Sequence, residues 1–276
     1  MTSIPTRLLS DGRSIPVIGL GTMPMNDEEV STAIISAVDL GYRLIDTASL
    51  YRNEVGVGHG IARSSVDRSE IFVTTKLRGG DQGRSESKVG LRGSLERLDL
   101  DYVDLLLIHW PMPSVNKYVD AWLAMIELRD EGLARSIGVS NFNEAHLSRL
   151  LEETGVMPVV NQIELHPAWS QLHLRSVDAR HDIVTESWSP LGRGATLEMY
   201  PAVAEAARAH DVTPAQIVLR WHLQLGALPI PKASSLEHQR ANLAVFDFEL
   251  SPAEMMAFES IPQERMDEEP ETFVEL

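Results

Sequence analysis

Short runs of apolar residues alternate with longer amphipathic segments along most of this sequence. The runs are apolar over nearly their whole length, which is typical of strands in a sheet that is covered on both faces. The segments between them repeat apolar residues at helical spacing. In the first of these segments, Val30, Ile34, Ala37 and Val38 fall on one face, and Gly41 predicts the end of the helix. The pattern therefore predicts a regular alternation of strands and helices.

Counting the apolar runs gives eight strands, over residues 15–21, 43–46, 71–75, 103–109, 134–139, 159–164, 183–188 and 227–231. The helices are expected to begin near Asn26, Asn53, Arg84, Val115, Asn143, Gln171, Pro201 and Thr213. Eight strand–helix units in one chain of this length favour an α/β fold of the (β/α)8 TIM barrel type over a doubly wound sheet. No linker or low-complexity segment divides the sequence, so we expect a single domain over residues 1–276.

Three segments fall outside the eight units. Asp11-Gly12 supplies the tight turn of an N-terminal β-hairpin. The stretch 251–254 combines a capping box with a proline in the first turn, which predicts an extra helix near the C-terminus, outside the barrel. Residues 262–276 are acidic and lack periodicity. We expect this tail either to be slack or to fold across the mouth of the barrel.

The composition excludes several classes of partner. A net charge of −16 argues against nucleic acid, whose phosphates need a basic surface. The absence of cysteine excludes disulfides, thiolate nucleophiles and zinc–thiolate sites. No apolar run approaches the roughly 20 residues of a membrane helix, and the N-terminus lacks the apolar core of a signal peptide. We therefore expect a cytoplasmic protein without a membrane or nucleic-acid partner.

Ionisable residues stand at the ends of three predicted strands. Asp46, Lys76 and His109 end three of the apolar runs, and Tyr51 follows Asp46 by five positions. Because parallel strands of a barrel end at one rim, these four side chains are expected to converge. A tyrosine has a pKa near 10, and a neighbouring ammonium eases the release of its proton. The set is therefore suited to placing a proton on a carbonyl oxygen, with His109 orienting the substrate.

Taken singly, each of these residues also has a structural explanation. Asp46 would cap the next turn, Tyr51 would pack a loop, Lys76 would be solvated, and His109 would be a satisfied core histidine. Four such explanations would all have to hold at once for residues at or just beyond three strand ends, so the chemical interpretation is favoured.

The stretch Asp46-Thr47-Ala48-x-x-Tyr51-x-Asn53-Glu54 resembles the signature of the aldo-keto reductase family. Further family phrases follow in the family's order, at residues 18–22, 138–142, 161–167, 188–192 and 230–232. The resemblance extends from about Ser14 to about Phe248. Within the family, the sequence is similar to the bacterial branch near the 2,5-diketo-D-gluconic acid reductases and their actinobacterial relatives.

The resemblance implies a catalytic tetrad of Asp46, Tyr51, Lys76 and His109, with Tyr51 as the general acid. It also implies an NADP(H) cofactor lying across the barrel mouth without a Rossmann fold, and Pro24 indeed stands where a dinucleotide fingerprint would have its third glycine. The implied cofactor contacts are Gly21, Thr22, Met23, Ser140, Asn141, Gln162, Trp188, Ser189, Leu191, Gly192, Lys232, Ser234, His238 and Asn242. Among these, Ser140, Asn141 and Gln162 would bind the nicotinamide carboxamide. Trp188 would stack on the nicotinamide ring.

One part of the implied cofactor site departs from the family pattern. Members that prefer NADPH usually have serine after the lysine and an arginine six positions after it, where this chain has Ala233 and His238. Lys232 still offers a cation to a 2′-phosphate, with Ser234 beside it. Neither lysine nor neutral histidine reproduces the guanidinium fork, so NADPH is favoured and NADH stays open.

The resemblance places the substrate pocket between Met23, Leu50, Trp110 and the loop after Lys76, which contains Arg78. Arg78 would favour anionic or polyhydroxylated carbonyl compounds, unless it is simply an exposed loop arginine. The family resemblance also suggests a monomer acting on a small carbonyl substrate. No metal is expected, since the histidines show no ligand spacing.

Two other functions stay open at this point. One is a nucleotide-binding module that senses NADPH with little turnover. The other is a metal-dependent barrel hydrolase that uses Asp46, His109 and His166.

Overall fold

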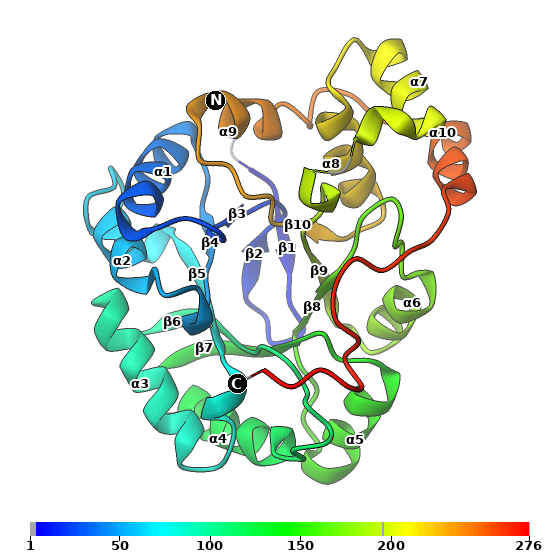
Figure 1. Cartoon of the computed structure of the whole chain (residues 1–276). Coiled ribbons are helices and arrows are strands. Elements are labelled where there is room, and N and C mark those ends of the chain that lie inside the picture. The colour runs from blue at the N-terminus through cyan, green and yellow to red at the C-terminus, as the bar shows by residue number, and fades with distance from the viewer. Residues whose placement is uncertain (1–3, 195, 276) are drawn as a thin grey trace.

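A computed structural model describes residues 4–194 and 196–275, and its centre is an eight-stranded parallel sheet (Figure 1). The strands are β3 (Leu20–Gly21), β4 (Leu44–Asp46), β5 (Phe72–Leu77), β6 (Val103–Ile108), β7 (Ala134–Ser140), β8 (Val160–Glu164), β9 (Val184–Trp188) and β10 (Leu228–Pro229). The sheet closes on itself, because the amides of Gly19 and Gly21 each donate at 3.1 Å to the carbonyls of Pro229 and Pro231. The predicted (β/α)8 barrel is confirmed.

Helices surround the sheet in a ring (Figure 1). They are α1 (Asp27–Leu40), α2 (Glu54–Ala62), α3 (Glu86–Leu98), α4 (Tyr118–Asp130), α5 (Glu144–Thr154), α6 (Leu172–Arg180), α7 (Pro201–His210), α8 (Pro214–Gln224), α9 (Leu236–Leu243) and α10 (Pro252–Ala257). Asn26, Asn143 and Thr213 form capping boxes at the starts of α1, α5 and α8, and Ser251 forms the one predicted at the start of α10. No helix in the described part of the chain has both the length and the apolarity needed to cross a membrane.

The N-terminal hairpin closes one end of the barrel. Its strands β1 (Thr6–Leu8) and β2 (Ser14–Pro16) pair antiparallel, and Gly12 takes a φ of +86° in the turn. Leu9 and Ile15 are buried in the same apolar cluster as inward-facing residues of the barrel strands. The prediction of one strand over residues 15–21 was wrong. Ile15 and Pro16 belong to the hairpin strand β2, residues 17–19 lie in no strand, and the barrel strand β3 begins only at Leu20.

Along five of the barrel strands, β4, β5, β6, β8 and β9, the inward face changes from apolar to polar. Side chains of a strand alternate between its two faces, so residues two apart point the same way. Leu44 of the closed end is followed on the same face by Asp46, and Phe72 is followed by Thr74 and Lys76. The same step leads from Leu105 and Leu107 to His109, from Val160 to Gln162, and from Val184 to Glu186. Polar groups therefore gather at the carboxyl ends of the strands.

The extra helix and the tail complete the chain. The short helix α10 lies outside the barrel, as predicted, and Phe258 just after it stacks on Trp221 of α8 with ring centroids 5.1 Å apart. From Pro262 the chain forms no helix or strand as far as Glu275 and crosses the mouth of the barrel, where it is drawn in red (Figure 1). The expectation that the tail folds across the mouth of the barrel is confirmed, and a slack tail is not observed over residues 262–275.

Candidate active site

Lys76 occupies the centre of the polar cluster at the mouth of the barrel. Its Nζ donates to Oδ1 of Asp46 at 2.6 Å, to the carbonyl of Thr47 at 3.0 Å and to Oη of Tyr51 at 3.3 Å. The side chain of Lys76 is fully buried, and that of Asp46 nearly so. Strands β4 and β5 are hydrogen-bonded neighbours, which explains why their inward-facing carboxylate and ammonium meet. All three donor positions of the ammonium are thus used.

Tyr51 and His109 complete this group from two different elements. Tyr51 lies in a 3-10 turn (Ser49–Tyr51) just after β4, and His109 directly follows β6. Their rings meet edge to face, with centroids 5.9 Å apart. The four residues predicted from the strand ends therefore lie together in the structure.

The pKa values of the group reflect burial and charge in opposition. Burial raises the pKa of the Tyr51 phenol above its ordinary value, while the Lys76 ammonium acts in the lowering direction. For Lys76, burial favours the neutral amine, but Asp46 and Tyr51 outweigh it and raise the pKa of the ammonium. Tyr51 therefore keeps its proton at neutral pH, beside a lysine that stays charged. The lysine limits the rise in the tyrosine pKa rather than reversing it.

A second carboxyl group, that of Glu186, lies beneath the first, and no pattern in the sequence indicates its position. Nε2 of Gln162 donates to Oδ2 of Asp46 at 2.8 Å and to Oε2 of Glu186 at 2.7 Å. Burial, with Asp46 adding to it, raises the pKa of Glu186 to about 8. The other oxygen, Oε1, has no hydrogen-bond partner among the described residues. Because both amide hydrogens of Gln162 serve these carboxyls, only its Oε1 is left for a ligand.

Two signature residues build the frame of the site. Asn53 is buried, and its Nδ2 donates to the carbonyls of Thr22 at 3.0 Å and Met25 at 2.9 Å. This side chain ties the loop after β3 to the loop after β4. Glu54 accepts from Thr75 at 2.7 Å and pairs with Arg97 of α3 at the same distance. The signature thus carries fold-positioning residues beside the candidate catalytic ones.

The candidate nicotinamide contacts form a network at the ends of β7, β8 and β9. Nδ2 of Asn141 donates to the carbonyl of His109 at 3.0 Å and to Oγ of Ser140 at 3.2 Å, and its Oδ1 accepts from Nε1 of Trp188 at 2.9 Å. The Ser140 hydroxyl donates to the carbonyl of Gln162 at 2.8 Å. The indole of Trp188 is partly exposed at this rim. The structure therefore brings these four predicted residues together.

The candidates on the first strand lie on the same rim. Gly21 sits so close to the end of β10 that a Cβ would come within 2.7 Å of the Ile230 carbonyl oxygen. Thr22 is buried and donates to the Asp46 carbonyl at 2.9 Å. Met23 is 54% exposed.

The candidates after β9 form a tight turn. The amide of Gly192 donates to the Ser189 carbonyl at 2.9 Å, so it is already used within the turn. Leu191 is half-buried against the apolar cluster around α8. Arg193, which was not predicted, lies with Cζ 5.6 Å from the Trp188 ring and pairs with Asp267 of the tail.

The candidates near α9 divide into exposed and buried ones. Lys232 is exposed, and its Nζ donates to Oγ of Ser234 at 3.0 Å. No carboxylate in the described ranges 4–194 and 196–275 pairs with it. His238 is exposed in the first turn of α9. Asn242 is buried near Tyr42 rather than lying on the helix surface.

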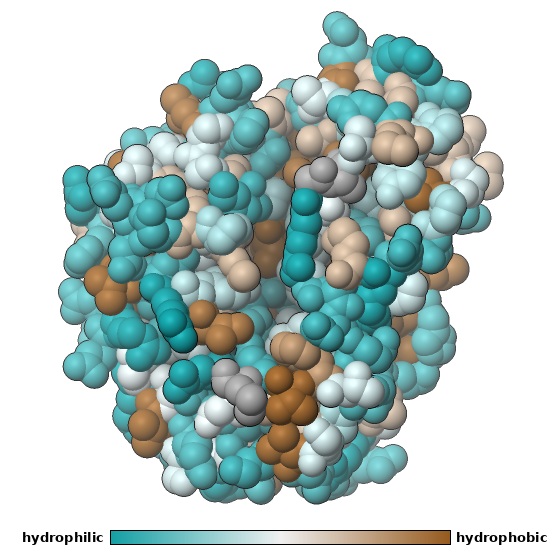
Figure 2. All heavy atoms as spheres, viewed as in Figure 1, coloured by the Kyte–Doolittle hydropathy of each residue, from teal (hydrophilic) through white to brown (hydrophobic). Residues whose placement is uncertain are grey.

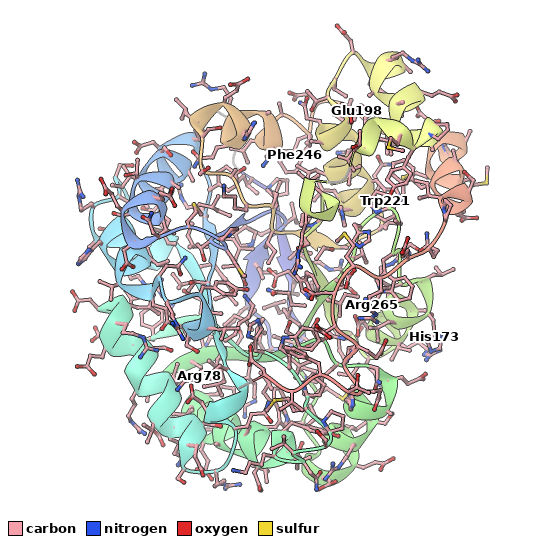
Figure 3. The ribbon with its side chains drawn as sticks, viewed as in Figure 1. Arg78, His173, Glu198, Trp221, Phe246 and Arg265 are labelled. Atoms are coloured by element: carbon pink, nitrogen blue, oxygen red, sulfur yellow. The ribbon has the colours of Figure 1, made fainter. Side chains whose placement is uncertain are left out.

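The candidate substrate pocket is partly filled by the tail. Trp110 is buried and contacts Phe273 of the tail with ring centroids 4.7 Å apart. Leu50 is 36% exposed. Arg78 pairs with Asp81 at 3.1 Å and stays half-exposed, near the place where the tail ends (Figure 3). Figure 2, drawn from the same side, shows a largely hydrophilic face that is hollowed near its centre.

His166 has a structural partner. Its Nε2 lies 3.0 Å from Oε1 of Glu164, and the same oxygen accepts the Met266 amide of the tail at 2.7 Å. Within the part of the chain that the structure describes, no group of three His, Asp or Glu residues has the arrangement of a metal site. His166 and Glu164 therefore serve to hold the tail.

Comparison with known proteins gives consistent matches over nearly the whole chain. Residues 17–263 match the aldo/keto reductase family. An aldo-keto reductase of Mycolicibacterium vanbaalenii is 50% identical over 98% of this chain and 97% of its own. The 2,5-diketo-D-gluconic acid reductase B of a Corynebacterium species is 48% identical over the full length of both chains. The crystal structure of an aspartate-to-alanine mutant of Gox0644 in complex with NADPH superposes with a TM-score of 0.93, at 43% identity and 98% coverage of both chains.

Proposed function

The chain belongs to the aldo/keto reductase family, and within it we propose that this enzyme uses NADPH to reduce aldehydes and ketones to alcohols, with Tyr51 as the general acid. The observation that carries the proposal is the position of Lys76. Its buried ammonium bridges the Asp46 carboxylate and the Tyr51 hydroxyl. A structural salt bridge would not need a phenol as its third partner.

The four side chains divide the work of protonating a carbonyl oxygen. Tyr51 keeps its proton until a carbonyl oxygen accepts it. Lys76, 3.3 Å away, then stabilises the negative charge that develops on the phenol oxygen. Asp46 keeps Lys76 protonated through their 2.6 Å contact. His109 stands beside Tyr51 and orients the carbonyl by a second hydrogen bond.

The rim residues fit a nicotinamide dinucleotide. A partly exposed indole at Trp188 offers a flat apolar face. Asn141 accepts its N–H, and Ser140 and Gln162 are joined to Asn141 in one network of hydrogen-bonding groups suited to a carboxamide. Lys232 offers an exposed ammonium whose partner among the described residues is the Ser234 hydroxyl, which suits a phosphate. When bound there, NADPH supplies the hydride. The remaining chemistry of the step is the proton transfer described above.

The cofactor preference rests on Lys232 and Ser234. These two residues support a preference for the 2′-phosphate of NADPH, while His238 in place of an arginine weakens it. We therefore propose NADPH as the cofactor, with slower use of NADH.

The substrate is proposed only as a class. The name of the Corynebacterium relative suggests keto sugar acids, and small dicarbonyls share the same reacting group.

We also propose that residues 1–276 act as one domain and as a monomer, which sedimentation velocity would test.

The test is turnover of a carbonyl panel by wild type and by Tyr51→Phe. The panel contains methylglyoxal, an aromatic aldehyde and a diketo sugar acid, and NADPH consumption is followed by absorbance. We expect the wild type to consume NADPH and Tyr51→Phe to lose 10²- to 10⁴-fold in kcat, the usual contribution of a positioned acid. Binding of NADPH without turnover by the wild type would instead identify a sensor.

A further inference from the structure

The tail crosses the barrel mouth through a series of defined contacts. It begins at the loop after β8, where the Gln263 side chain donates to the Pro167 carbonyl at 3.1 Å. It continues past Glu164 and reaches α5, where Glu271 lies 3.4 Å from His146. It then places Phe273 on Trp110. In Figure 3, Arg265 marks the start of this path beside α6, and Arg78 marks the far side of the mouth.

The tail ends on the candidate proton donors. Oε1 of Glu275 lies 2.6 Å from Nδ1 of His109, and Oε2 of Glu275 accepts a hydrogen bond from the Gly79 amide. The Glu275 side chain is 3% exposed. Its charge also acts to raise the pKa of Tyr51, as expected for a carboxylate close to the phenol. An acidic group of the chain itself therefore fills the corner between His109 and Tyr51.

Gly79 is shaped to receive this part of the tail. A Cβ at this position would come within 2.3 Å of the Glu275 carbonyl oxygen and 2.6 Å of Sδ of Met112. The neighbouring Gly80 has no such constraint, because nothing lies within 4 Å of its Cβ position. The closed tail therefore leaves no room for a side chain at Gly79, whereas there is room for one at Gly80.

The contact between Glu275 and His109 is poorly formed despite its short distance. The facing atoms, Oε1 of Glu275 and Nδ1 of His109, are close but poorly aligned, so neither makes a well-formed hydrogen bond. No Lys or Arg of the described residues lies within ion-pairing distance of this carboxylate. Burying a carboxylate without a Lys or Arg partner is costly, so a ligand that offers a neutral oxygen can displace it.

Resting on the proposed function, we propose that Glu275 is a specificity-determining residue whose carboxylate competes with the substrate's carbonyl oxygen for the corner between His109 and Tyr51. A substrate binds productively only when residues 271–275 move away. The negative charge that stays on the displaced tail disfavours anionic carbonyl compounds more than neutral ones.

Two variants remove the competitor in different ways. Glu275→Gln keeps the size of the side chain and removes its charge. Gly79→Ala keeps Glu275 and excludes the tail by collision. The matched controls are Glu268→Gln, which removes an exposed charge from the same tail, and Gly80→Ala, which adds a methyl group where there is room. Thermal unfolding and NADPH binding show whether each variant is folded.

The measurement is KM and kcat for benzaldehyde and 4-carboxybenzaldehyde with NADPH. If the tail is closed in about nine of ten ligand-free molecules, we expect both test variants to lower KM roughly tenfold and to change kcat little. Glu275→Gln lowers the KM of the anionic aldehyde more than that of the neutral one. The controls leave both values unchanged. An unchanged or higher KM in folded Glu275→Gln and Gly79→Ala overturns the proposal.

Hydrogen exchange of the tail provides a readout apart from activity. In the ligand-free protein, peptides covering residues 266–276 are expected to exchange faster in Glu275→Gln and Gly79→Ala than in wild type or the controls. Equal exchange in all five proteins also overturns the proposal. A wild type without turnover would defeat the proposed function, whereas an active wild type with unresponsive variants defeats only the role of Glu275.

Discussion

The two ends of the barrel are built from the same strands by different rules. At the closed end, Leu9 and Ile15 of the hairpin pack against Leu44, Leu105 and other apolar residues of the strands. At the open end, one or two residues further along the inward faces, the strands carry charged and polar groups joined by hydrogen bonds. The closed end is stable when its apolar side chains fill the available volume. The open end is stable when each buried donor, acceptor and charge has a partner.

The difference predicts how each end tolerates change. Substitution at the closed end should lower stability without altering the chemistry of the molecules that remain folded. Substitution at the open end should alter the chemistry, and it should also be costly wherever it leaves a buried charge without its partner.

The largest effect is expected at the open end from Lys76→Met. This change leaves Asp46 buried with Gln162 but without its cation, and it removes the ammonium beside Tyr51. We expect a loss of roughly 3–5 kcal/mol in the free energy of unfolding and of about 10²-fold or more in kcat/KM. Urea unfolding and steady-state kinetics measure the two losses. Exposed Lys117→Met is the control, and a Lys76→Met enzyme with wild-type kcat/KM would contradict the role of the ammonium.

A stability effect without a chemical one is expected at the closed end from Ile15→Ala. Ile15 is fully buried, and truncation leaves a cavity that costs about 2–5 kcal/mol. The midpoint of urea unfolding should fall accordingly, while kcat/KM at 25 °C stays within twofold of wild type. A large loss of kcat/KM in the folded variant would show that the two ends are coupled, against the comparison.

A pH-dependent effect is expected from Glu186, the protonated acid between the two ends. Its pKa is raised from 4.5 to about 8 by burial and by Asp46. Between these values the unfolded chain releases the proton and the folded chain keeps it, so the folded state binds more protons and stability falls as pH rises. Glu186→Gln should remove this fall and be more stable than wild type at pH 8, by on the order of a few kcal/mol. Parallel unfolding curves for the two proteins from pH 5 to 8 would argue against it.

The smallest effect is expected at the outer rim from His238→Arg. His238 is exposed at the start of α9, close in sequence to Lys232 and Ser234. An arginine adds a fork that can bind a phosphate with two hydrogen bonds. We expect the ratio of kcat/KM for NADPH to that for NADH to rise about tenfold, or roughly 1.4 kcal/mol. Arg240→His is the reverse control two positions on, and an unchanged ratio in His238→Arg would remove this position from the cofactor site.

The sequence predicts the barrel and its tetrad for the same physical reason. Asp46, Lys76 and His109 could be found because each ends an apolar run, and strand ends of a parallel barrel meet at one rim. The start of α4 was predicted too early, near Val115. Met112 and Asn116 take left-handed conformations in a turn there, and Tyr118 is the first helical residue.

Residues whose role depends on depth or on distant contacts could not be predicted. Glu186 looks like any polar residue within a strand, and only the closed barrel places it beneath Gln162 and Asp46. Glu275 lies in an aperiodic segment, and its approach to His109 depends on the whole path of the tail across the mouth. Arg193 likewise gains its contact with Trp188 only through the turn after β9.

The most direct test of the central claim, that Tyr51 delivers the proton at the open end, is a single-turnover measurement on Tyr51→Phe. Enzyme with pre-bound NADPH is mixed with a saturating aldehyde, and oxidation of the cofactor is followed by stopped-flow absorbance. The account predicts that NADPH binds as tightly as in wild type while the rate of oxidation falls 10²- to 10⁴-fold. A Tyr51→Phe enzyme that oxidises its bound cofactor at the wild-type rate would contradict it.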